Sequence, residues 1–80
     1  MTDMTVKLRE EMTRVQARFG NPASTHECLG VITEEFHELV DAIRGNRMDF
    51  IRGEALQLAA ASLRLAEACE KTGFVARSVK

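Results

Sequence analysis

Five carboxylates lie within one short stretch of the chain, and they are the side chains best suited to chemistry. If this stretch is helical, about 100° separates neighbouring residues, and Glu27, Glu34 and Asp41 then share a face opposite the apolar side chains. We expect these three to be solvated. Glu35 and Glu38 instead border the apolar side, where carboxylates rarely lie without a partner.

A short turn at residues 45–46 supplies such a partner. It separates two predicted helices by so little that they must run antiparallel as a hairpin. Counted outward from the turn, Glu38 is level with Glu54, and Glu35 is level with Gln57. Three carboxylates and one amide can therefore converge across the hairpin. Hard oxygen ligands of this kind suit Mg²⁺ or Mn²⁺, which keeps several waters and accepts substrate phosphates.

A simpler interpretation of the acids remains open at this stage. Acid-rich helix faces are usually solvated, and an acid pair three residues apart is common. Four arginines near the hairpin can also neutralise the acids as surface ion pairs worth about 0 to 1 kcal/mol each; they are Arg44, Arg47, Arg52 and Arg64.

Three helices are expected to position these residues, at about 3–19, 25–44 and 47–71. The first has an apolar stripe with spacings of three and four, and it ends where Gly20 precedes a proline. Ser24 and Glu27 have the spacing of a capping box that begins the second helix. Asn46 is the expected N-terminal cap of the third.

The third helix predicts an oligomer because it is apolar nearly all round, and a helix of that kind is buried on several sides. A chain of 80 residues buries only about 60% of its unfolded surface and is marginally stable alone. Two cysteines are too few for a disulfide framework or a zinc module. We therefore expect a single all-α domain over residues 1–80, an antiparallel helical bundle completed by oligomerisation.

Charge and hydropathy exclude several classes of partner. Eleven basic and twelve acidic residues give a formal net charge of -1, without the basic surface expected of a nucleic-acid-binding domain. No apolar run approaches the ~20 residues that span a bilayer, and the N-terminus lacks the pattern of a signal peptide. We expect a cytoplasmic protein with reduced thiols that binds neither nucleic acid nor membrane.

The order of the acids resembles that of the MazG-like all-helical nucleoside triphosphate pyrophosphohydrolase superfamily. That family carries E-E-x-x-E followed, after a gap, by E-x-x-D; here residues 34–38 are EEFHE and residues 54–57 are EALQ. The resemblance covers residues 25–68, and residues 14–20 are similar to the segment ahead of the motif in small, often phage-associated or actinobacterial, relatives. It implies a helical dimer or tetramer and Mg²⁺-dependent hydrolysis of nucleoside triphosphates to monophosphate and pyrophosphate, a house-cleaning of nucleotides.

The resemblance also implies roles for individual residues. Glu35, Glu38 and Glu54 would bind the metal, and Gln57 stands where the family has Asp, so the fourth ligand brings no charge. Catalysis would fall to Glu34, Glu35 and Glu38, with Glu34 or a ligand carboxylate as the base. The arginines proposed to bind the phosphates are Arg18, Arg52 and Arg64. Because of Gln57, an inactive oligomeric module that binds nucleotide or protein stays the alternative.

Aromatic and sulfur side chains receive simpler interpretations. Core packing is expected for Phe36, whereas Phe19 and Phe50, near helix ends, are candidates for a pocket wall. Cys28 and Cys69 are at unequal heights from the turn, which argues against an intrachain disulfide. We expect both to pack as small core residues.

Overall fold

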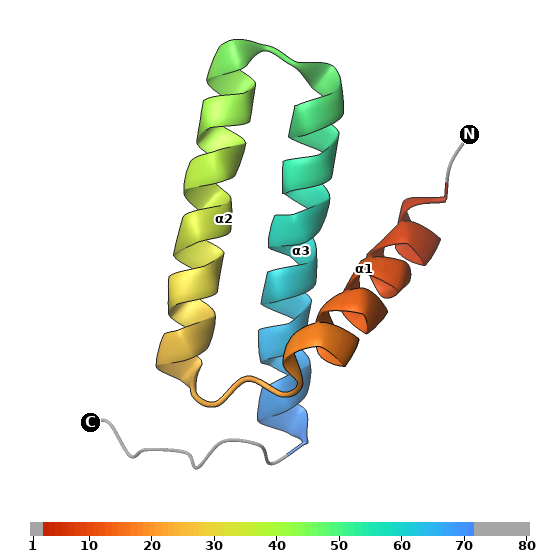
Figure 1. The fold of residues 1–80 in the computed structure, drawn as a ribbon, viewed down its shortest axis with the longest axis vertical. Helices are drawn as coiled ribbons and strands as arrows, with labels where there is room; N and C mark the ends of the chain where they lie inside the picture. The colour runs from red at the N-terminus through yellow and green to blue at the C-terminus, as the bar shows by residue number, and fades with distance from the viewer. Residues whose placement is uncertain (1–2, 72–80) are drawn as a thin grey trace.

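Three helices make up the chain in a computed structural model that describes residues 3–71 (Figure 1). The helices are α1 (Met4–Phe19), α2 (Thr25–Gly45) and α3 (Met48–Glu70), and the described part has no strand. The expected all-α class and the three helix ranges are confirmed to within a residue or two at each end. None of these helices is long and apolar enough to cross a membrane.

The first two helices are bounded by the residues that the sequence indicates. Gly20 ends α1 with φ of 71°, a conformation that glycine adopts without strain, and its N–H donates to Gln16 O at 2.8 Å. At the start of α2, Glu27 N–H donates to Ser24 Oγ at 3.1 Å. Glu27 Oε1 accepts from Ala23 N–H at 2.7 Å, one residue earlier than in the usual capping box.

The turn between α2 and α3 uses Asn46 differently from the expectation. Asn46 has φ of 57° and ψ of 39°, and its N–H donates to the carbonyl oxygens of Ala42 and Ile43 at the end of α2. It is therefore the C-terminal cap of α2, a left-handed position that asparagine tolerates better than most residues. The N-cap of α3 is Arg47, which makes no side-chain capping bond, so the predicted capping of α3 by Asn46 is wrong.

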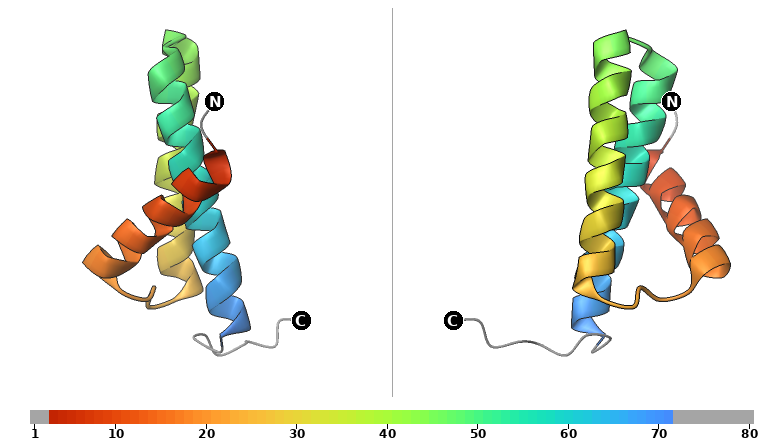
Figure 2. Two further views of the ribbon diagram at one scale, coloured as in Figure 1. Left: turned by 90° about the vertical axis from the view of Figure 1, so that its right-hand side faces the viewer. Right: turned by 60° about the vertical axis from the view of Figure 1, so that its left-hand side comes forward.

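The expected antiparallel hairpin is confirmed: α2 and α3 lie side by side along their lengths, and α1 crosses α3 obliquely (Figures 1 and 2). Among the described residues, α1 packs on α3 and not on α2. In the part of the chain that the structure describes, four side chains are buried, namely Met12, Cys28, Ala42 and Ala60, and no large side chain there is completely enclosed. Cys28 packs in the core as predicted, whereas Cys69 is exposed, which corrects the prediction for that residue.

Within residues 3–71 no helix covers one side of the hairpin, and this corrects the prediction that Phe36 is a core residue. Cys28, Glu35 and Ala42 lie toward α3. Cys28 and Ala42 are buried, and Glu35 is half-buried and accepts a hydrogen bond from Gln57 of α3. The residues that follow each of these, Leu29, Phe36 and Ile43, are 51–59% exposed. They are turned by about 100° from the contact line, and α1 covers only the opposite side.

Candidate functional site

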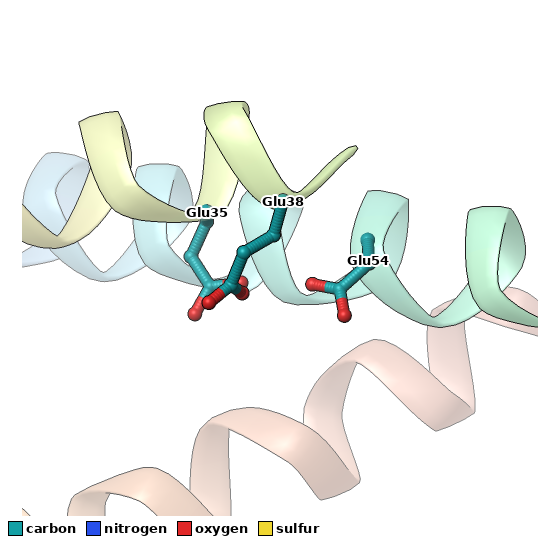
Figure 3. A group of neighbouring side chains, drawn as sticks. All are labelled: Glu35, Glu38 and Glu54. Atoms are coloured by element: carbon teal, nitrogen blue, oxygen red, sulfur yellow. The ribbon is translucent and has the colours of Figure 1, made fainter. Parts of the chain in front are cut away.

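Three carboxylates converge across the hairpin at about the middle of its length. Glu35 and Glu38 come from α2 and Glu54 from α3, and one oxygen of each lies within 4.8 Å of the others (Figure 3). Glu35 and Glu54 are half-buried, and Glu38 is exposed. The heights counted from the turn therefore predict correctly that these three acids meet.

Gln57 adds a fourth polar group to this acid cluster, by which we mean Glu35, Glu38 and Glu54. Its amide nitrogen donates to Glu35 Oε1 at 3.0 Å and to Glu54 Oε1 at 3.3 Å. Turned by 180°, the same amide presents its oxygen to those carboxylates. The group can thus bridge two acids by hydrogen bonds, or supply an oxygen ligand when a cation lies between them.

The electrostatics of the acid cluster favour the binding of positive charge. Partial burial, followed by repulsion from Glu38 and Glu54, raises the pKa of Glu35 from 4.5 to about 7. The pKa of Glu54 is also raised, first by desolvation and then by its contact with Glu38. Carboxylates that repel one another in this way are stabilised by a divalent cation, which neutralises their charge at close range.

Within residues 3–71, no salt bridge neutralises a carboxylate of the acid cluster. Salt bridges there join Arg9 to Glu67 and Arg14 to Glu11, and both of these pairs lie outside the cluster. Arg47, one of the arginines considered for neutralisation, lies with its guanidinium carbon 3.9 Å from the centroid of the Phe50 ring.

A pocket of about 410 Å³ adjoins the acid cluster, enclosed by α1, the loop that follows it, α2 and α3. Glu35 belongs to both the cluster and the pocket wall, and Gln57, which donates a hydrogen bond to Glu35, also lines the pocket. The middle of the wall is apolar and small, with Ala60 and Ala61 on α3 and Val31 on α2. This volume is typical of a site for a small molecule.

Only one of the three arginines predicted to bind phosphate lines this pocket in the part of the chain that the structure describes. Arg64 does so, and its Nη2 donates to Gly20 O at 2.6 Å and to Gln16 Oε1 at 3.2 Å. Arg18 is exposed and stacks on the Phe19 ring at 5.1 Å, and Arg52 is exposed on α3.

Of the other residues predicted to belong to the site, Glu34 and Phe19 line the pocket and Phe50 does not. Glu34, the proposed base, is exposed at the pocket wall beside Glu35. Phe19 lines the pocket while remaining 67% exposed, as expected for a pocket wall. Phe50 is 48% exposed and does not line it.

Sequence reasoning misses the contribution of α1 to this pocket. Arg14 and Glu11 both line it, and they form a bidentate pair with distances of 2.6 and 3.3 Å. Their spacing of three residues is a signal for the pair itself. This spacing does not indicate which face of α1 is turned toward the hairpin, because no connection as short as the α2–α3 turn fixes the height of α1.

Comparison of the chain with protein-family models, with curated proteins and with solved structures finds no match. The resemblance to MazG-like enzymes therefore depends on the motif residues alone. The geometry of the acid cluster and its pocket is independent of that resemblance.

Proposed function

We propose that this chain is a metal-dependent nucleotide pyrophosphohydrolase of MazG-like type, acting in the cytoplasm on a nucleoside triphosphate to give monophosphate and pyrophosphate. The observation that carries the proposal is the convergence of Glu35, Glu38 and Glu54 beside a pocket of small-molecule size. Arg64 adds positive charge in the same pocket, which suits an anionic ligand.

The donor set fits Mg²⁺ or Mn²⁺. Three carboxylates and the Gln57 amide offer only hard oxygen atoms, and the raised pKa values of Glu35 and Glu54 mark acids that lack a counter-charge. When bound there, the ion would neutralise the polyphosphate and lower the pKa of a water. Two of the carboxylates come from α2 and the third from α3, so the site bridges the hairpin.

Glu34 is the proposed proton acceptor. It precedes Glu35, lies on the pocket wall and is exposed to solvent, so it can exchange its proton with water after each turnover. In the reaction a water oxygen adds to phosphorus, the bond bridging the α and β phosphates breaks, and the water proton passes to Glu34. Pyrophosphate leaves on one side and the monophosphate on the other.

The experiment is magnesium-dependent release of pyrophosphate from a panel of deoxynucleoside triphosphates. Glu38→Gln should reduce the rate at least about 100-fold, the loss expected when a charged ligand is removed from a working site. Asp41→Asn is the matched control, because it removes an exposed acid from the same helix without touching the acid cluster. Hydrolysis unaffected by Glu38→Gln would contradict the assignment.

A second candidate function is favoured by Gln57, which lowers the charge of the donor set by one. We infer that a chain with weak metal affinity would serve as an oligomeric helical module that binds nucleotide or protein without cleaving it. Nucleotide binding that raises the melting temperature, with no pyrophosphate released at any magnesium concentration, would establish this candidate in place of the enzyme.

We propose further that a second copy covers the apolar side of the hairpin, which comprises Leu29, Phe36 and Ile43 of α2 and the exposed small residues of α3. Ala55 and Ala66 lie about 160–200° round α3 from the pocket-lining Arg64. Both are exposed, so within residues 3–71 both helices leave the same side open. No carboxylate occupies the α2 stripe, whereas the opposite side of α2 carries Glu27, Glu34 and Asp41.

The area of this open side fits a dimer. At 1.5 Å per residue the two helices are about 30 Å long, and two helices packed 8–10 Å apart present a face roughly 20 Å wide. About 600 Å² per copy gives about 1,200 Å² in a symmetric pair, the lower end of stable interfaces. A tetramer requires a further surface.

The oligomer is tested by the mass in solution. Light scattering should give a whole-number multiple of 8.9 kDa, and melting should shift with protein concentration. Phe36→Glu places a charge in the interface and should dissociate the pair, whereas His37→Glu, one residue away and exposed, should not. A wild-type monomer at micromolar concentration would refute this part of the proposal.

A further inference from the structure

We propose that the end of the pocket remote from the acid cluster is a nucleobase subsite selective for guanine, formed by Arg64, Glu27 and Phe19. The inference rests on the proposed function in one respect, which is that the phosphates lie at the acid cluster. It adds a role for Arg64 that differs from phosphate binding.

The spacing along α3 separates the two ends of the pocket. Gln57 and Arg64 are seven residues apart, so they share a face of α3 and stand about 10.5 Å apart along its axis. That length is close to an extended nucleoside monophosphate. With phosphates at Gln57, the small wall of Ala60 and Ala61 leaves space for the sugar, and the base reaches Arg64.

Arg64 presents unused donors to this end of the pocket. Both of its hydrogen bonds leave from Nη2 and go to neutral oxygens, those of Gly20 and Gln16. Within residues 3–71 no carboxylate forms a salt bridge with it. The rest of the guanidinium fork is therefore available to a ligand that offers two adjacent acceptors.

Guanine alone among the four bases offers two acceptors side by side on its Hoogsteen edge, O6 and N7. Adenine places a donor beside N7, and the corresponding edges of cytosine and thymine carry a single polar group. An arginine fork at this position therefore discriminates in favour of guanine. The same pairing is the commonest specific contact between arginine and a base.

Glu27, which lines the pocket from α2, supplies the complementary acceptor. Its Oε1 accepts from Ala23 N–H at 2.7 Å, which fixes the carboxylate at the start of α2, and the residue lines the pocket. Counted outward from the turn, Glu27 is 18 residues before Gly45 and Arg64 is 18 after Asn46, so they lie near the same level of the antiparallel hairpin. The second oxygen of Glu27 is suited to guanine N1–H and the 2-amino group, both of which are donors.

Phe19 completes the subsite with a surface for stacking. Phe19 lines the pocket and is 67% exposed, and the Arg18 guanidinium carbon lies 5.1 Å from the centroid of its ring. Stacking between a base and an aromatic ring is tolerant of base identity. It therefore adds affinity for every nucleotide, while Arg64 and Glu27 decide the preference.

The test measures binding of dGMP, dAMP, dCMP and dTMP by calorimetry, with and without Mg²⁺. The wild-type chain should bind dGMP at least about tenfold more tightly than the other three, the discrimination expected of one bidentate contact. Arg64→Met should reduce that preference to about threefold or less. Arg44→Met, which removes an exposed arginine far from the pocket, is the control and should keep it.

Two modified ligands test the same contacts without altering the protein, in case Arg64→Met unfolds the chain. The 7-deaza analogue of dGMP lacks N7, and deoxyinosine monophosphate lacks the 2-amino group; each should bind wild type about tenfold more weakly than dGMP. Equal affinities for the four bases, or no loss with either analogue, would overturn the subsite. A guanine preference without hydrolysis would support the subsite and refute the enzymatic proposal.

Discussion

Glu35 gives the chain a pH-dependent stability that Glu35→Gln should remove. In the folded chain partial burial and then Glu38 and Glu54 raise its pKa from 4.5 to about 7. Below pH 4.5 the folded and unfolded chains both hold the proton. Between pH 4.5 and 7 the folded chain binds more protons than the unfolded chain, so the free energy of unfolding falls as pH rises. Above pH 7 Glu35 is charged in both states, and the full loss of folding stability caused by its burial and its acidic neighbours is present.

The size of this loss of stability follows from the pKa difference. A rise of about 2.5 units at 1.36 kcal/mol per unit gives an upper limit of about 3.4 kcal/mol. Because Glu35 remains partly open to water at the pocket wall, screening reduces this to about 1–2 kcal/mol. For a domain of this size each kcal/mol shifts the melting temperature by about 4–8 °C. At pH 8, Glu35→Gln should therefore melt about 5–15 °C higher than the wild type.

The assay is thermal unfolding followed by circular dichroism between pH 4.5 and 8.5 in the absence of divalent cations. The two proteins should melt together near pH 4.5 and diverge steadily as the pH rises to 8. Asp41→Asn is the control, and its difference from wild type should not change over this window. If Glu35→Gln and wild type differ by the same amount at both ends of the range, the electrostatic account of the acid cluster is wrong.

Substitutions at three other positions test separate parts of the structure. Gln57→Asp restores a full charge to the donor set, so a magnesium titration of the melting temperature should show tighter binding than in wild type. Asn46→Ala should cost about 1 kcal/mol in urea unfolding, because its φ of 57° is strained for alanine, while Asn46→Gly should cost less. Ala60→Leu should destabilise by about 1–3 kcal/mol, since Ala60 is 2% exposed between packed helices. An unchanged urea midpoint for Asn46→Ala would contradict the turn conformation described, and an unchanged midpoint for Ala60→Leu would contradict the packing.

Local rules of the sequence determined the three helices and the meeting of the acids. Apolar spacing and the residues at Gly20 and Ser24 set the helix limits, because these effects act within a turn or two of the chain. The two-residue connection at residues 46–47 leaves α3 no freedom of height against α2. Once that register is fixed, Glu38 and Glu54 must come level, and counting residues is sufficient to pair them.

Tertiary structure alone decided how α1 lies and what it encloses. A loop of five residues joins α1 to α2, and the contacts that orient α1 are long-range, such as the bond from Arg64 to Gly20 O across 44 residues. Neither the choice of Arg64 over Arg18 nor the exposure of Phe36 follows from helical periodicity, which fixes the faces of a helix but not the neighbours that cover them. The pocket exists because α1 packs on one side of the hairpin, and the sequence by itself does not specify that side.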